Sequence, residues 1–155
     1  MHYFITGTDT DAGKTYAACL LIEALRRAGH DAVGYKPFAC GDRADAHALR
    51  EAGGHALTLE ETNPVFFKAP ASPYAAALLE NKTVDLEAAR QGFDALAARH
   101  ASVLVEGAGG WEVPLADGMT MAGFAASLGL PVILVVDNRL GCLNHTLLTL
   151  RAIRA

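Results

Sequence analysis

Four short apolar runs recur along the chain, and each ends in a polar or glycine-containing segment. They span residues 3–5, 32–35, 103–105 and 132–136 and are rich in branched and aromatic side chains. Runs of this length and composition are typical of strands that are buried on both faces. We therefore expect four buried strands.

Helical patterns follow three of these runs, at residues 14–28, 44–53 and 143–154. A further Ala-rich amphipathic helix is expected over residues 86–100. The alternation of strand with helix predicts a single α/β domain over residues 1–155, with a mainly parallel sheet flanked by helices. Because the last helix would usually cross back to another strand, we expect this domain to lack its C-terminal strands and to be the N-terminal two thirds of a longer one.

Composition narrows the classes of partner. The 155 residues carry 13 basic and 17 acidic side chains with no basic stripe, which argues against a nucleic-acid surface. The longest apolar run, residues 130–136, is too short to span a membrane, and no basic segment typical of a secretory signal precedes the first one. The three cysteines lack C-x-x-C spacing, so neither a disulfide framework nor a zinc site is expected. These features predict a cytoplasmic protein that acts on a small molecule.

The segment GTDTDAGKT, residues 7–15, joins the first expected strand to the first helix. Its end, Gly13-Lys14-Thr15, matches the phosphate-loop pattern G-x-x-x-x-G-K-[ST], but the first glycine of that pattern would stand at position 8, where the chain has Thr8 after Gly7. In such loops the backbone N–H groups bind phosphate oxygens, the lysine reaches the β- and γ-phosphates, and the hydroxyl ligates Mg²⁺. The segment predicts a nucleoside triphosphate site, and ATP is the expected nucleotide.

Further charged residues are expected beside this loop, because ligands of open α/β sheets bind at the carboxyl ends of the strands. Lys36 follows the second run and Glu106 follows the third. Lys36 would be a second phosphate clamp, and Glu106 would join Thr15 around Mg²⁺. Either Asp42 or Asp45 offers another oxygen ligand. This set suffices for phosphoryl transfer but leaves the acceptor open.

Six segments, in this order, resemble the dethiobiotin synthetase family, the ATP-dependent ligases of biotin biosynthesis: GTDTDAGKT, GYKPFACG, ASPYAAAL, VEGAGGWEVPL, LPVILVVD and LGCLNHTLLT. The resemblance runs over residues 2–149, and the family's loop has the same offset glycine. It implies a P-loop NTPase-like fold and an acceptor, a carbamate formed from CO₂ (or bicarbonate) on 7,8-diaminononanoate. The carbamate would take the γ-phosphoryl group, giving a carbamic–phosphoric anhydride, and the second amine would then close the ring.

The resemblance also implies the residues of the site. The catalytic residues would be Lys14 and Lys36, and the metal ligands would be Thr15, Asp45 and Glu106. Nucleotide and metal together would be bound by Asp11, Ala12, Gly13, Lys14, Thr15, Tyr16, Asp45, Glu106, Gly107, Ala108 and Gly109. The diamine would contact Thr10, Cys40 and Gly110. The start of the last helix, Gly141, Cys142, Leu143 and Asn144, would bind the substrate carboxylate of the neighbouring subunit in a homodimer with shared active sites.

Three positions depart from the family's pattern. Cys40 stands where many members have a serine or threonine, Tyr74 replaces the usual histidine, and a short loop before Asp45 makes Asp42 a rival metal ligand. The family's adenine-contacting segment is expected beyond residue 155.

Two other functions remain as alternatives. One is a synthetase that amidates a cobyrinate-type carboxylate. The other is a regulatory ATPase of the plasmid-partition or septum-site type, but those proteins carry an extra lysine early in the loop, and positions 7–9 here are Gly-Thr-Asp.

Overall fold

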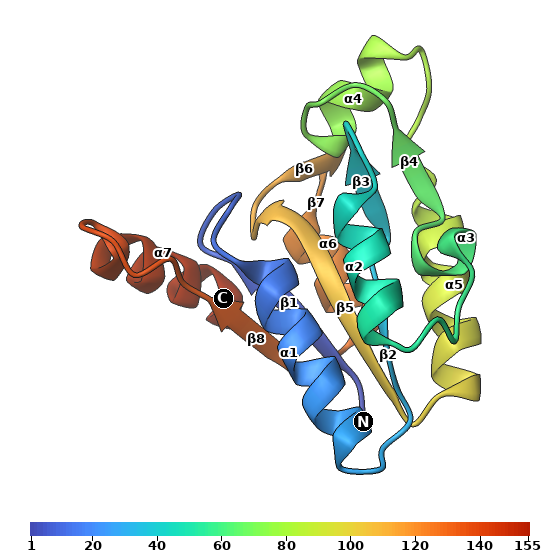
Figure 1. Cartoon of the computed structure of the whole chain (residues 1–155). Helices are drawn as coiled ribbons and strands as arrows, with labels where there is room; N and C mark the ends of the chain where they lie inside the picture. Colours follow the sequence, from blue (N-terminus) through green and yellow to red (C-terminus); the bar gives the residue numbers. More distant parts are fainter.

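Four parallel strands form the central sheet of the computed structural model, which describes residues 1–155. Their order across the sheet is β2-β5-β1-β8, with β1 and β5 in the middle (Figure 1). The strands are β1 (Tyr3–Gly7), β2 (Ala32–Tyr35), β5 (Ser102–Gly110) and β8 (Val132–Val135). The four apolar runs thus became the four strands, and the predicted mainly parallel α/β fold is confirmed.

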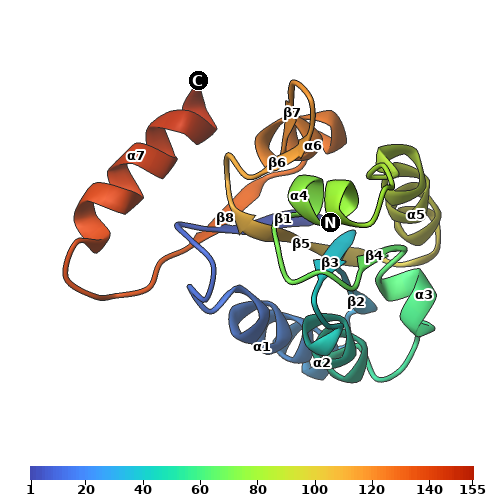
Figure 2. The ribbon, with the colours of Figure 1, turned by 90° about the horizontal axis from the view of Figure 1, so that it is seen from above.

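Helices cover both faces of this sheet (Figure 2). One face carries α1 (Lys14–Arg27) and α2 (Ala44–Ala52), and the other carries α4 (Pro73–Leu79), α5 (Leu86–Arg99) and α6 (Met121–Leu128). The chain also forms α3 (Leu59–Thr62), the parallel pair β3 (Phe38–Cys40) and β4 (Val65–Phe67), and the antiparallel pair β6 (Pro114–Ala116) and β7 (Met119–Thr120). None of the helices combines the length and the apolar character that crossing a membrane requires.

Two buried clusters hold these layers together because successive side chains of a strand point to opposite faces. Ile5 packs with Ile22 of α1 and Leu49 of α2 in a cluster of 6 buried residues. Phe4, its neighbour, belongs to a cluster of 19 buried residues that includes Phe93 of α5. The sheet is therefore apolar on both sides, as its near-continuous hydrophobic strands require.

The third strand runs further than predicted. Glu106 was expected to end it and to precede a glycine loop, but β5 continues to Gly110. Ile5 of β1 pairs with Glu106 and Gly7 pairs with Gly110, so β5 advances four residues while β1 advances two, which makes a bulge. Gly109 has φ of 66°, in the left-handed region that favours glycine. The prediction was wrong because a glycine-rich segment resembles a loop until its pairing with a neighbouring strand is known.

The helix α7 (Cys142–Arg154) lies beyond β8 and stands away from the other helices (Figures 1 and 2). It has no buried residue. Four leucines of α7 and the preceding turn are more than half exposed, namely Leu140, Leu143, Leu147 and Leu148. The expectation that further strands complete the domain stays a prediction.

Candidate active site

The phosphate loop connects β1 to α1 and is shaped by close contacts of its own backbone. A Cβ atom at Gly7 would lie 3.0 Å from the carbonyl oxygen of Asp9 and 3.1 Å from the Lys14 side chain, closer than side chains ordinarily pack, so position 7 favours glycine. Thr8 instead donates its N–H to the Val135 carbonyl at 3.1 Å, which extends the pairing of β1 with β8. The loop therefore packs closely around position 7, while position 8 belongs to the strand ladder.

The N-terminus of α1 is open to an anion. Gly13, with φ of 87°, precedes the helix, no side chain caps it, and no acidic residue lies in its first turn. The free N–H groups and the helix dipole at such an end favour phosphate oxygens. The Lys14 ammonium lies 2.8 Å from the Asp9 carbonyl oxygen, so it is held at the mouth of the loop.

Four elements bring a charged cluster together beside this loop. The Nζ atom of Lys36, which follows β2, lies 2.7 Å from Oδ2 of Asp45 in α2 and 2.6 Å from Oε1 of Glu106 in β5. The Thr15 hydroxyl of α1 donates to the same Glu106 oxygen at 2.8 Å. The side chains of Lys36 and Glu106 are 5% and 0% exposed, whereas that of Asp45 is 47% exposed. Residues distant in sequence thus form one buried ion-pair network.

Burial and neighbouring charges set the protonation of this cluster. Burial alone would lower the pKa of Lys36, but Glu106 and Asp45 outweigh it and raise that pKa above its ordinary value. Burial would raise the pKa of Asp45, but the Lys36 ammonium holds it below its usual range. Burial, and then the repulsion of Lys36, lower the pKa of Lys14. A polyphosphate between the two ammonium groups would relieve that repulsion.

The cluster fits a magnesium ion. Oε2 of Glu106 is buried without a hydrogen-bond partner, which is costly for a carboxylate oxygen unless a ligand engages it. Thr15 and Asp45 supply further oxygens beside it. Mg²⁺ in phosphate-loop sites takes one or two carboxylates and completes its shell with phosphates and water. No group of three or more His, Cys, Asp or Glu side chains is arranged to hold a metal by itself.

The two candidate aspartates of the short loop have different positions. Asp42 accepts the N–H of Ala44 at 2.9 Å and so holds the start of α2. Asp45, the second residue of α2, instead accepts a hydrogen bond from Nζ of Lys36. The geometry favours Asp45 over Asp42 as the metal ligand, and the assignment stays a prediction.

Two adjoining pockets meet at this cluster. The phosphate-loop pocket, of about 280 Å³, is lined by residues of the loop and by the charged cluster. The side pocket, of about 430 Å³, extends toward β3 and the segment before α4. Both pockets are lined by Thr10, Lys36, Asp45 and Gly109. The remaining lining of the side pocket is mixed: Phe38, Ala39, Cys40, Asp42, Pro70, Ala71, Ser72, Pro73, Ala108 and Val113.

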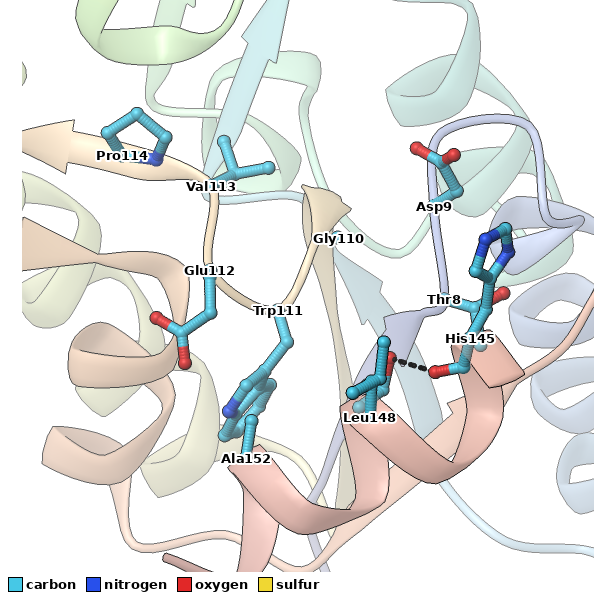
Figure 3. A pocket seen from close by; sticks show the side chains of 11 residues that line it. Thr8, Asp9, Gly110, Trp111, Glu112, Val113, Pro114, His145, Leu148 and Ala152 are labelled. Carbon is cyan, nitrogen blue, oxygen red and sulfur yellow. Dashed lines mark hydrogen bonds between the residues drawn. The ribbon is translucent and has the colours of Figure 1, made fainter. Parts of the chain in front are cut away.

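A larger cavity of about 490 Å³ lies elsewhere, between α7, the start of the phosphate loop and the turn after β5 (Figure 3). Trp111 faces α7 there, and His145 lies on the side of Asp9. Neither Lys14, Lys36 nor Glu106 lines it. Chemistry, not volume, therefore identifies the two smaller pockets as the candidate site.

Not every residue expected in the site lies there. Ala12 is buried and lines none of these pockets, and Gly107 packs against the Phe4 ring while only its carbonyl faces Lys36, at 3.4 Å. Gly110 lines the cavity beside α7 and not the side pocket. The start of α7, Gly141 to Asn144, lines none of the three pockets, so one chain does not bring it to Lys36.

The segment directly before α4 forms a wall of the side pocket, and it was not predicted to be part of the site. The sequence marks it by Pro70 and by Ser72-Pro73, which indicate only an interruption between regular elements. Tyr74, which departs from the family's pattern, does not line the side pocket.

Cys40 should be a slow nucleophile. Burial, and then the charge of Glu80, raise the pKa of its thiol to about 11. Because alkylating agents attack the thiolate, we expect its reaction with iodoacetamide to accelerate about tenfold per pH unit up to about pH 10 without levelling off. Peptide mass spectrometry of the alkylated chain measures this rate. The same cysteine in urea-unfolded protein is the control and should level off above about pH 9; levelling off at that pH in the folded protein would contradict the expectation.

Comparison with known proteins adds to this geometry. A family model described as an AAA domain matches residues 1–155. The ATP-dependent dethiobiotin synthetase BioD of Akkermansia muciniphila is 54% identical over 153 residues, which cover 99% of this chain and 72% of that protein. The protein of the same name from Anaeromyxobacter dehalogenans is 51% identical, covering 97% and 69%. The ATP-dependent dethiobiotin synthetase BioD 1 of Escherichia coli O157:H7 is 42% identical, covering 98% and 71%.

Proposed function

We infer that this chain, which belongs to the family of ATP-dependent dethiobiotin synthetases, is a ligase that closes the ureido ring of dethiobiotin from 7,8-diaminononanoate and CO₂. The observation that carries this proposal is the position of Lys36, whose ammonium group borders both the phosphate-loop pocket and the side pocket. A phosphoryl donor in the first pocket and an acceptor in the second would therefore meet at one buried cation.

The reaction divides between the two pockets as follows. One amine of the diamine adds to CO₂ and loses a proton, which gives a carbamate in the side pocket. A carbamate oxygen attacks the γ-phosphorus of ATP, the bond to the β,γ-bridging oxygen breaks, and ADP leaves. The second amine then attacks the carbamate carbon, the bond from that carbon to the phosphate oxygen breaks, and phosphate leaves as the ring closes with loss of a proton.

The residues of the chain would contribute position and charge in these steps. The N-terminus of α1 and Lys14 would bind the phosphates of the nucleotide. Lys36 would neutralise charge that develops on the oxygens between donor and acceptor, where a preorganised cation has its largest effect. The buried lining of the side pocket, including Phe38, would exclude water from the mixed anhydride.

Thr15, Asp45 and Glu106 would hold Mg²⁺, which supplies charge neutralisation to the β- and γ-phosphates when bound. The unpartnered Glu106 oxygen supports this assignment.

We also propose a cytoplasmic homodimer with shared active sites. Gly141 to Asn144 open α7 without a side-chain cap, and apart from Cys142, whose N–H donates to the Arg139 carbonyl at 3.0 Å, their N–H groups suit a carboxylate; yet these residues line neither pocket of their own chain. In a two-fold dimer they would serve the substrate of the partner. Cytoplasmic location agrees with the use of ATP.

The test is an ADP-release assay with Mg²⁺ and ATP, with and without diaminononanoate and bicarbonate. ADP release that requires both, together with dethiobiotin in the mass spectrum, is the expected result. ADP release without either would favour the partition-type ATPase. Release that requires a cobyrinate-type carboxylate and an amine donor would favour the amidating synthetase.

A further inference from the structure

Glu80, the residue directly after α4, accepts hydrogen bonds from the start of the segment that connects β4 to α4 and walls the side pocket. Its Oε1 atom accepts the N–H of Lys68 at 2.5 Å and the N–H of Ala69 at 3.0 Å. Neither N–H donates to a backbone carbonyl. The other carboxylate oxygen bonds Nζ of Lys82 at 2.6 Å, and the Glu80 side chain is 17% exposed. Hydrogen bonds from Lys82 and then from the two N–H groups hold the pKa of Glu80 below its usual range, so this acceptor is charged at neutral pH.

The segment that Glu80 holds is a wall of the side pocket. Residues 68–72 connect β4 to α4 without forming a helix or strand. Pro70, Ala71 and Ser72 of this segment, with Pro73 of α4, line the side pocket. A segment without regular structure takes its position from its side-chain contacts, and charged acceptors make the stronger ones.

Close packing against Gly41 also holds this wall. The Gly41 N–H donates to the Phe67 carbonyl at 2.9 Å, and a Cβ atom at Gly41 would lie 3.2 Å from Pro70. Gly41 has φ of 84°, so it turns the chain directly after Cys40, which also lines the pocket. The wall is therefore packed against Gly41, directly after β3, and anchored by Glu80.

We propose that Glu80 is a positioning residue for the acceptor. By fixing residues 70–73, it sets the width of the side pocket and hence the affinity for the diamine, without touching substrate or nucleotide. This inference rests on the proposed function, because it takes the diamine as the occupant of the side pocket.

Steady-state kinetics of the full chain with Mg²⁺, ATP, bicarbonate and diaminononanoate test the proposal. We expect Glu80→Ala to raise KM for diaminononanoate about tenfold, the scale of one lost charge-assisted hydrogen bond, with kcat and KM for ATP changed less than about twofold. Glu80→Gln should restore most of the affinity, because its amide oxygen can accept the same N–H groups. The matched control is Glu87→Ala, which removes an exposed glutamate of α5 that bonds only Gln91.

A merely structural role predicts a different outcome. In that case Glu80→Ala would lower the melting temperature, while the folded enzyme kept the wild-type KM for the diamine, and the proposal would be overturned. If Glu80→Ala does not fold, Glu80→Asp carries the test, because its carboxylate is one methylene shorter and reaches the N–H groups of residues 68–69 less well. A raised KM for the diamine alone supports the positioning role, and a wild-type KM or a parallel loss of kcat and ATP affinity overturns it.

Amide hydrogen exchange separates this proposal from the proposed function. The amides of Lys68 and Ala69 should exchange faster in the Glu80 variants, with the exchange of α1 and β5 unchanged. Unchanged amide exchange at residues 68–69 would show that Glu80 does not hold this segment, and it would overturn the proposal whatever the activity of the enzyme. If these amides exchange faster in the variants while the wild-type protein shows no diamine-dependent ADP release, the proposed function is rejected and the positioning of residues 68–69 by Glu80 is supported.

Discussion

Replacing Lys36 by methionine is expected to reduce kcat at least about a hundredfold, the scale of losing one preorganised charge from a transition state. Lys36 is the cation that borders both pockets, and no other ammonium group lines the side pocket. Methionine keeps most of the length of the buried stem. The assay is ADP release at saturating substrates, below the unfolding temperature of the variant. Arg27→Met, at an exposed cation of α1 outside both pockets, is the control and should retain wild-type kcat.

The same variant tests the metal assignment without any turnover. The Lys36 ammonium bonds Asp45 and Glu106, the carboxylates expected to hold Mg²⁺. Its removal takes away a competing positive charge, so we expect nucleotide-free Lys36→Met to bind Mn²⁺ about tenfold more tightly, as measured by electron paramagnetic resonance. Unchanged Mn²⁺ affinity would show that these carboxylates are not the metal ligands. A near-normal kcat in the ADP-release assay would show that Lys36 takes no part in catalysis.

The second large effect is expected on folding. Glu106→Gln leaves the buried Lys36 with only the half-exposed Asp45 as its ionic partner. Breaking a buried ion pair on one side costs about 3 kcal/mol or more, because a charge stays buried without compensation. We expect a loss of about that size in the free energy of unfolding, measured by urea denaturation, together with loss of Mg²⁺-dependent activity.

A double variant identifies the cause of this loss. Lys36→Met combined with Glu106→Gln removes both buried charges, so it should be more stable than Glu106→Gln alone even though it is inactive. Glu112→Gln, at an exposed glutamate near the end of β5, should leave stability unchanged. If the double variant is less stable than Glu106→Gln, the pair stabilises the fold through packing and not through charge compensation.

Regular elements and the phosphate loop could be predicted from the sequence because they are determined locally. The strands and the long helices lie within about two residues of their hydrophobic patterns, apart from β5. The end of β5 could not be predicted, since the glycines after Glu106 continue the strand only through their pairing with β1. The choice between Asp42 and Asp45 depended on which carboxylate faces Lys36, which the predicted start of α2 at residue 44 does not give by itself.

The network around Lys36 was predictable only in part. The carboxyl-end rule for open sheets brings Lys36 and Glu106 to one edge, but the direct ion pair with Asp45 requires the orientation of α2. Glu80 had no local signal at all, because its partners Lys68 and Ala69 lie 12 and 11 residues earlier and are backbone groups. Such contacts are invisible to patterns of side-chain type.

The packing of Gly7 against the Asp9 carbonyl and the Lys14 side chain has an evolutionary consequence. Purifying selection should act more strongly on position 7, where a Cβ atom would crowd the loop, than on position 8, whose contribution to the β1–β8 ladder is a backbone N–H. The position of the first glycine in a phosphate-loop motif would then indicate which peptide lies closest to the lysine. That position could differ between lineages that bind the same anion.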